Sequence, residues 1–180
     1  MTHNVCFSGG AKGADVAWGI AAEQAGHDVI HFSFAGHKAG TTENLHELTI
    51  DELLRANDHV KRACKSLNRP YQPNKPWFKL LQRNWYQINQ TERVYAITEI
   101  QPLANSRSCV KGGTGYAIEM AIDLGIRDIH VFDQVKGLWY YWCCSHWLAD
   151  NKPETPYGLW TGIGSRDIND TGLQAIIDLF

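Results

Sequence analysis

The chain has 180 residues, of which 44% are hydrophobic and 20% charged, with 17 basic and 19 acidic side chains. This length and composition suit one globular domain with a full core, which we place at residues 1–180. The near balance of charge provides no long-range field that would recruit nucleic acid or a membrane surface, so we expect neither partner. No apolar run approaches the roughly 20 residues that span a bilayer, and the polar start lacks a signal peptide's regions, so we expect a cytoplasmic protein.

The cysteines argue against a disulfide framework and against a structural zinc site. There are five of them, an odd number, and no Cys-x-x-Cys pair occurs. Cys143 and Cys144 stand close to His146, but adjacent cysteines share one tetrahedral ion only with strain, and no second cluster offers further ligands. We therefore expect free thiols in a reducing compartment, no metal site and no cofactor.

The first 40 residues predict two strands that flank one helix. Residues 4–8 and 28–34 are β-branched and aromatic runs, and Ala14 to Ala25 carries apolar residues at helical spacing. Gly26 suits the C-terminal cap of that helix. The second strand leads into the polar loop 35–40, where a ligand could be contacted.

Two more helices are expected before the next strand. Thr49 and Glu52 have the spacing of a capping box, which predicts a helix that runs to about Leu67. Prolines interrupt the pattern after it. The next helix begins near Pro76, because proline suits the first helical position, and its apolar residues extend at helical spacing to Ile88.

The second half of the chain alternates strands and helices. We expect a strand at 93–98, a helix from Thr114 to Leu124, a strand at 129–133, a strand within 158–166, and a helix from Asp170, as its cap, to about Phe180. This alternation predicts an α/β fold with a mainly parallel sheet, whose ligand crevice lies beyond the carboxyl ends of the strands. The loop that contains His37 and the carboxylate of Asp133 would sit at that edge.

The segment 138–147 is unusually aromatic, with three of the seven tryptophans. We interpret it as a packing or subunit surface, because aromatic side chains of this size are rarely left in water. As a subunit surface it would support a homodimer. Stacking on the base of a ligand is the alternative.

Two glycine-rich segments carry the functional signal. Ser8 to Asp15 and Lys111 to Glu119 each follow a strand-like run and open a helix-like run. Glycine lets the backbone approach a phosphate closely, and the helix that follows points unpaired N–H groups at the anion. Neither segment is a Walker A box or a dinucleotide fingerprint. Together they predict a cradle for the phosphates of a nucleotide-like ligand.

The candidate ligand-binding residues come from four parts of the chain. They are Ser8, Gly9, Gly10, Lys12 and Asp15 in the first turn, Asn84 on the helix after Pro76, Lys111, Gly112, Gly113, Thr114 and Gly115 in the second turn, and Gly164, Ser165 and Arg166 after the last strand. Simpler roles stay open for several of them. Ser8 and Thr114 can cap helices, the two lysines can be solvated, and the helix dipole alone favours Asp15.

Four phrases together resemble the SLOG superfamily, whose members include the DprA DNA-processing proteins, the YpsA-like proteins and the LOG phosphoribohydrolases. They are Gly162-Ile163-Gly164-Ser165-Arg166, Ser8-Gly9-Gly10-Ala11-x-Gly13-Ala14-Asp15, Arg83-Asn84 and Gly112-Gly113-Thr114, and they are nearest to phage and bacterial proteins that carry all four. The resemblance implies a Rossmann-like domain that binds a nucleotide or nucleotide-derived molecule.

The order of the phrases differs from that in these relatives. Their first strand, Gly162 to Arg166 here, stands at the C-terminus. We expect a circular permutation, which places Phe180 close to Met1, because an exposed joint between a helix and a strand tolerates new termini. A swapped dimer, in which this strand completes a neighbour's sheet, is the alternative.

The resemblance to the LOG enzymes implies catalytic roles for Glu119 and Arg83 in cleaving the N-glycosidic bond of a nucleoside monophosphate. A carboxylate can stabilise an oxocarbenium-like transition state or activate water, while a guanidinium holds phosphate or the departing base. Alternatively, Glu119 bonds a ribose and Arg83 only binds phosphate. Three hypotheses remain: a nucleotide-binding module, which we favour, an N-glycosidase-like hydrolase, and a DprA-like single-strand nucleic-acid binder, against which the near-neutral charge counts.

Overall fold

The structure is a computed structural model that describes residues 3–102 and 106–180. Eight strands in these residues form one sheet in the order β3-β2-β1-β8-β4-β5-β6-β7. They are β1 (Val5–Ser8), β2 (Asp28–Phe34), β3 (Leu45–Leu48), β4 (Arg93–Thr98), β5 (Asp128–Asp133), β6 (Leu138–Cys143), β7 (His146–Asp150) and β8 (Leu159–Gly164). The pairs from β3 to β5 are parallel, and β6 and β7 add an antiparallel hairpin at one edge.

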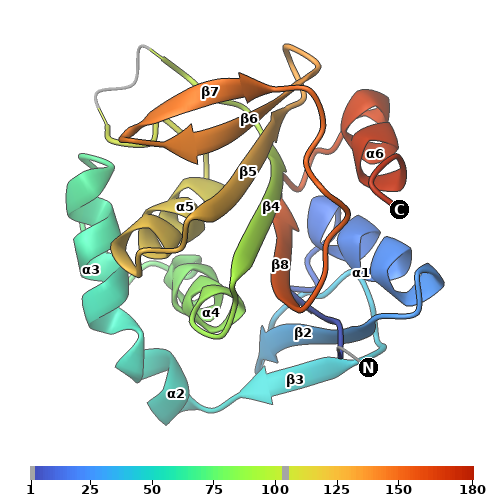
Figure 1. Ribbon diagram of the computed structural model, residues 1–180. Coiled ribbons are helices and arrows are strands. Elements are labelled where there is room, and N and C mark those ends of the chain that lie inside the picture. The colour runs from blue at the N-terminus through green and yellow to red at the C-terminus, as the bar shows by residue number, and fades with distance from the viewer. Residues whose placement is uncertain (1–2, 103–105) are drawn as a thin grey trace.

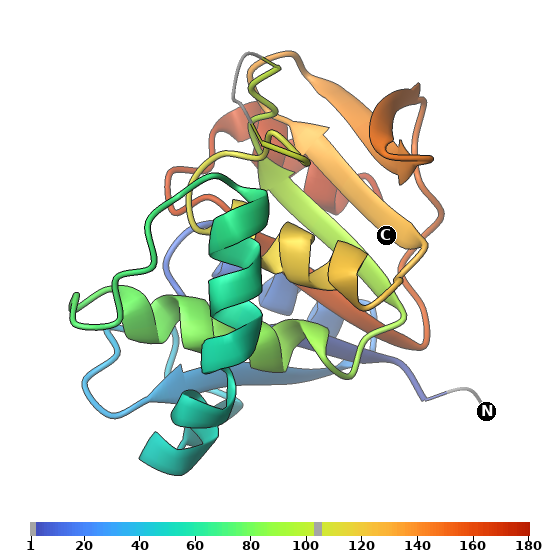
Figure 2. The same ribbon diagram turned by 90° about the vertical axis from the view of Figure 1, so that its left-hand side faces the viewer.

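Helices cover both faces of the sheet, as Figures 1 and 2 show. One face carries α1 (Ala14–Gln24) and α6 (Asp170–Ile177), and the other carries α2 (Ile50–Arg55), α3 (Asn57–Ser66), α4 (Phe78–Ile88) and α5 (Thr114–Asp123). Successive side chains of a strand point to opposite faces. Along β4, Val94 therefore packs in the core under α3 to α5, while Tyr95 packs in the core under α1 and α6. The predicted Rossmann-like, three-layer α/β fold is confirmed.

The last strand of the chain lies at the centre of the sheet. β8 pairs in parallel with β1 on one side and with β4 on the other. It thus completes the sheet of its own chain, beside the N-terminal strand. Phe180 and Asn4 both contact His27, since the rings of Phe180 and His27 have centroids 5.7 Å apart and Nε2 of His27 lies 3.3 Å from Nδ2 of Asn4. Met1, which was expected close to Phe180, lies outside the described residues.

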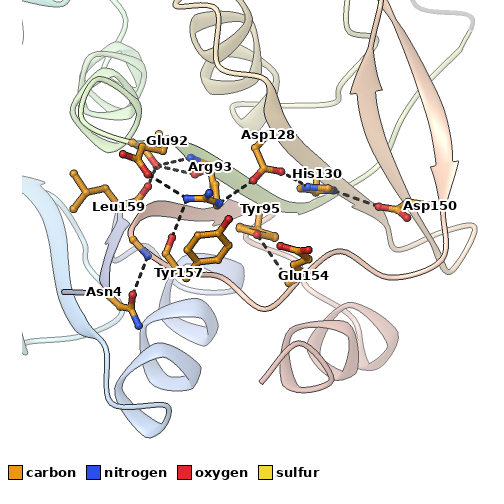
Figure 3. A network of polar contacts seen from close by, with 12 residues as sticks. Asn4, Glu92, Arg93, Tyr95, Asp128, His130, Asp150, Glu154, Tyr157 and Leu159 are labelled. Atoms are coloured by element: carbon orange, nitrogen blue, oxygen red, sulfur yellow. Dashed lines mark hydrogen bonds and ion pairs between the residues drawn. The ribbon is translucent and has the colours of Figure 1, made fainter. Parts of the chain in front are cut away.

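A polar network holds the connection from β7 to β8 across the amino ends of the central strands (Figure 3). Nε of Arg93 lies 2.9 Å from the carboxylate of Asp128, and Nη1 of Arg93 donates to the carbonyl of Tyr157 at 3.3 Å. The Arg93 guanidinium also lies 3.6 Å from the centroid of the Tyr157 ring. His130 lies between the carboxylates of Asp128, at 2.6 Å, and Asp150, at 3.5 Å. These contacts hold the segment that leads into β8, the strand between β1 and β4.

Several helix boundaries differ from the prediction. Pro76, expected at the first helical position, precedes α4, which begins at Phe78, and α6 ends at Ile177. The capping box at Thr49 is present, but the helix predicted to follow it is two helices, because a hydrogen bond from Ala56 N to Leu53 O spans three residues and interrupts the α-helical ladder. The cap of α6 is Asn169, not Asp170. Asn169 has an extended backbone and its side chain accepts from the N–H of Gly172 at 2.8 Å, whereas Asp170 is already the first helical residue.

The two edges of the sheet were not predicted as strands. Three of the four residues of β3 are exposed, so that strand has no apolar pattern, and it forms because it pairs with the free edge of β2. The aromatic segment 138–147 forms the hairpin of β6 and β7. Its aromatic side chains pack within the chain: Trp139 is buried, and Trp142 and Trp147 meet edge to face with centroids 5.0 Å apart.

Candidate functional site

A cavity of about 470 Å³ lies at the carboxyl ends of β1, β8, β4 and β5, where ligands of open α/β sheets bind. Its walls come from the turn after β1, from α4, from the turn before α5 and from the segment after β8. The predicted site residues that line it are Lys12, Asp15, Arg83, Asn84, Lys111, Gly112, Gly113, Thr114, Gly164, Ser165 and Arg166. The fold therefore brings residues from all four predicted parts of the chain to one place.

A buried ion pair forms one side of the cavity. Nη1 of Arg83 lies 3.4 Å from Oδ2 of Asp15 and also donates to the carbonyl of Gly9. Oδ1 of Asp15 accepts from the N–H of Gly164 at 3.2 Å. Burial raises the pKa of the Asp15 carboxyl, and the positive charge of Arg83 opposes that rise. The pair thus ties α1, α4 and the end of β8 together.

The glycine turn before α5 is held by hydrogen bonds from two side chains and borders the cavity. Nδ2 of Asn84 donates to the carbonyl of Gly113 at 3.1 Å, and Arg69 donates to the carbonyls of Gly112 and Val110 at 2.8 and 3.2 Å. Gly113 has ordinary helical angles, φ −65° and ψ −30°, and a Cβ there would meet no atom of the described residues within 4 Å. Neither the backbone nor packing requires glycine at this position, so its missing side chain leaves free space at the wall of the cavity.

Positive charge exceeds negative charge around the cavity. Four cationic side chains line it, those of Lys12, Arg83, Lys111 and Arg166, against three carboxylates, those of Asp15, Glu99 and Asp167. Lys111 is paired with Glu99 at 2.6 Å, and Arg83 is paired with Asp15. Within residues 3–102 and 106–180, Lys12 and Arg166 form no ion pair, and both are exposed. As far as the described residues show, two cations thus have no ion-pair partner and can meet an anionic ligand.

Four other predicted residues have roles inside the protein instead of lining the cavity. Ser8 is buried and its hydroxyl donates to the carbonyl of Asp15 at 2.9 Å. A Cβ on Gly9 would collide with the Arg83 guanidinium, and a Cβ on Gly115 would collide with the carbonyl of Val110. Gly10 has φ +60° and lies against the side chain of His31. These residues are explained by packing and by backbone geometry.

Glu119 does not line the cavity and does not meet Arg83. It is fully buried, and its carboxylate accepts from Nε of Arg107 at 2.6 Å and from the N–H of Ser108 at 2.9 Å. The carboxylate therefore anchors the loop between β4 and α5. Asp133 has a similar role, because its carboxylate accepts from the backbone N–H of Ile100 at 3.1 Å and from the turn that follows β5.

Trp77 was not among the predicted site residues. Trp77 lines the cavity just before α4 and is 40% exposed. No residue of the segment 138–147 lines it, since that hairpin lies at the β6–β7 edge of the sheet. His37 does not line it either, and its ring stacks on Phe34. The signal that could have found Trp77 is an aromatic residue directly after Pro76, at a helix start that faces the carboxyl edge of the sheet.

We predict that the protein loses stability in acid because of His31, whose side chain lies against Gly10 in the first glycine turn. Burial lowers its pKa to about 4, and the nearby charge of Arg83 lowers it further. Because the unfolded chain takes up this proton near pH 6.5, stability is fully present above that pH and falls as the pH drops toward 4. Between pH 7 and pH 5, we expect this group to lower the free energy of unfolding of the wild type by about 1–2 kcal/mol. The free energy of unfolding of His31→Gln should fall less over the same pH range.

Urea unfolding of the wild type and of His31→Gln at both pH values measures this difference. His3→Gln, at an exposed position, is the control and should follow the wild type. If His31→Gln loses as much stability as the wild type between pH 7 and pH 5, His31 does not carry the effect.

Comparison of the chain with protein-family models, with curated proteins and with solved structures finds no match. None of the helices in the described part of the chain is both long and apolar enough to cross a membrane.

Proposed function

We propose that this protein binds a nucleotide or a nucleotide-derived small molecule in the cavity at the carboxyl ends of the central strands. The observation that carries the proposal is that a glycine turn at a helix N-terminus, Gly112 to Thr114, lies beside two cations, Lys12 and Arg166, that form no ion pair in the described part of the chain. A volume of about 470 Å³ lies within the range of small-molecule sites.

Each part of the wall suits one part of such a ligand. The N–H groups and the dipole of α5 favour a phosphate beside Gly113, which has no side chain of its own to fill that space. The guanidinium of Arg166 and the ammonium of Lys12 add charge-assisted hydrogen bonds to phosphate oxygens. The exposed ring of Trp77 offers a face on which a base can stack. The ion pair of Asp15 and Arg83 fixes the frame between these groups.

The proposal is for binding, as in a sensor or a sequestering protein. Of the two residues to which the LOG resemblance gives catalytic roles, only Arg83 lines the cavity, while the Glu119 carboxylate is occupied by Arg107 and Ser108. A hydrolase that used this pair on one ligand would need both groups at the cavity. The geometry therefore favours binding over N-glycosidic cleavage.

A thermal-shift screen tests the proposal with nucleoside mono-, di- and triphosphates, cyclic nucleotides, ADP-ribose and NAD. A ligand present at 100 times its dissociation constant stabilises the folded state by about 2.7 kcal/mol. For a chain of this size that corresponds to a rise in melting temperature of roughly 5–10 °C. The proposal fails if none of these compounds stabilises the folded protein.

Gly113→Asp is the variant that assigns the effect to the cavity. A carboxylate at this helix N-terminus is favourable for the fold, but it repels phosphate and fills the free space. We expect an unchanged or higher melting temperature without ligand, and loss of most of the ligand-induced shift. Asn57→Asp makes the same change of charge at the start of α3, away from the cavity, and should keep the shift. A full shift in Gly113→Asp would place the ligand elsewhere.

A further inference from the structure

The tip of the β6–β7 hairpin has an unusual composition for its geometry. Cys144 and Ser145 form the two-residue loop between β6 and β7, with φ 51° and 72°. Two-residue hairpin loops with positive φ at both positions strongly prefer Asn-Gly and similar pairs, and a side chain other than glycine in this conformation costs about 1 kcal/mol or more. Turn propensity therefore does not explain why cysteine occupies this position.

The two adjacent thiols lie close together and are accessible. The Sγ atoms of Cys143 and Cys144 are 3.3 Å apart, Cys144 is exposed and Cys143 is partly exposed, whereas Cys6 and Cys64 are buried. Hydrogen bonds lower the pKa of Cys143. The hydroxyl of Tyr141 donates the one with the larger effect, and the Cys144 thiol donates the other. The thiolate is the reactive form of cysteine, so one member of the pair is readied for attack.

We propose that Cys143 and Cys144 form a redox-active dithiol that is converted reversibly to an intramolecular disulfide by small-molecule disulfides such as oxidised glutathione. The Cys143 thiolate attacks one sulfur of the small disulfide, which gives a mixed disulfide and releases one small thiolate that takes up a proton. Cys144 then loses its proton and attacks the Cys143 sulfur, which displaces the second small thiol. The two cysteines lose two electrons in total, and the small disulfide gains them.

The disulfide formed in this way is readily reversed. Adjacent Cα atoms are about 3.8 Å apart across a trans peptide, less than the roughly 4.4–6.8 Å of most disulfides, so the bond is strained and easily reduced. The described residues contain no group of three or more His, Cys, Asp or Glu side chains that could hold a metal ion. The chemistry of this tip is therefore that of two thiols.

Peptide mass spectrometry of the full-length protein tests the proposal. The protein is reduced, freed of reductant, treated with oxidised glutathione, alkylated and digested with trypsin. Trypsin does not cleave the bond before Pro153, so the tryptic peptide that spans the hairpin tip is 137–166. Cys143 and Cys144 are the only cysteines in this peptide. We expect this peptide to be two hydrogen atoms lighter and to carry no alkyl group, and to regain two alkylation sites after treatment with dithiothreitol.

Single substitutions separate this reaction from ordinary glutathionylation. Cys144→Ser cannot close the ring and should retain one glutathione on Cys143. Tyr141→Phe, which removes the hydroxyl beside Cys143, should slow the oxidation and leave its product unchanged. Two alkyl groups on the wild-type peptide after treatment, two glutathiones on it, or a disulfide between two chains would each overturn the proposal.

Discussion

Arg83→Met is expected to lower the free energy of unfolding by about 3–5 kcal/mol, because it leaves the Asp15 carboxylate buried without its partner. The side chains of Arg83 and Asp15 are 6% and 4% exposed, so water cannot replace the lost charge. The carbonyl of Gly9 loses its donor in the same variant. Urea unfolding at pH 7 measures the loss, and Arg55→Met, at an exposed position on α2, should change stability by no more than about 0.5 kcal/mol.

The double variant Asp15→Asn with Arg83→Met distinguishes the ion pair from simple loss of packing. With both charges removed, no uncompensated charge stays buried, so we expect the double variant to be more stable than Arg83→Met alone. If the losses of stability in Asp15→Asn and in Arg83→Met add up to the loss in the double variant, the two groups act independently. A double variant that folds would also test whether Lys12 and Arg166 suffice to bind the ligand.

Trp18→Ala is expected to reduce stability by about 3–5 kcal/mol through the cavity that it creates. Trp18 on α1 is fully buried and packs on β8, where a Cβ on Gly162 would approach within 2.5 Å of its Cβ and Cγ atoms. Its Nε1 donates to the carbonyl of Ile163 at 3.2 Å, and that buried acceptor would lose its partner. Trp18 on α1 and Gly162 on β8 thus form a close packing contact between the first helix and the last strand.

Trp77→Ala is the matched control and should show the reverse pattern. Trp77 is 40% exposed, so its removal should lower stability by less than about 1 kcal/mol. If a base stacks on it, the same change should weaken ligand binding by about 1–3 kcal/mol. Chemical unfolding and ligand titration of the two variants measure both quantities. If Trp18→Ala lowers the free energy of unfolding by less than about 1 kcal/mol, the packing of Trp18 against Gly162 does not have the role assigned to it.

The central elements could be predicted from the sequence because their local signals agree with their burial. The strands 28–34 and 93–98 were predicted with the boundaries found in the structure, since most residues of both are β-branched or aromatic and both strands lie in the interior of the sheet. The capping box at Thr49 was found from its spacing alone. The edge strands β3 and β7 gave no such signal, because most of their side chains face solvent.

The site was predicted less completely because spacing along the chain does not show which groups a side chain meets. Glu119 shares a helix with the glycine turn, yet Arg107 and Ser108 from a preceding loop occupy its carboxylate. Gly9 and Gly113 look alike in the sequence, but one accommodates a buried guanidinium and the other borders free space. Trp77 becomes a candidate only when its helix is placed against the sheet.

The sequence by itself therefore determined the α/β class, the order of the central strands and helices along the chain, and the glycine turns that open α1 and α5, because these follow from local propensity and from periodic burial. Only the tertiary structure decided that β8 lies between β1 and β4, that Asp15 pairs with Arg83, and that Lys12 and Arg166 lie beside the glycine turn that opens α5. These features depend on contacts between residues distant in the sequence, whose free energies no local pattern of residues contains.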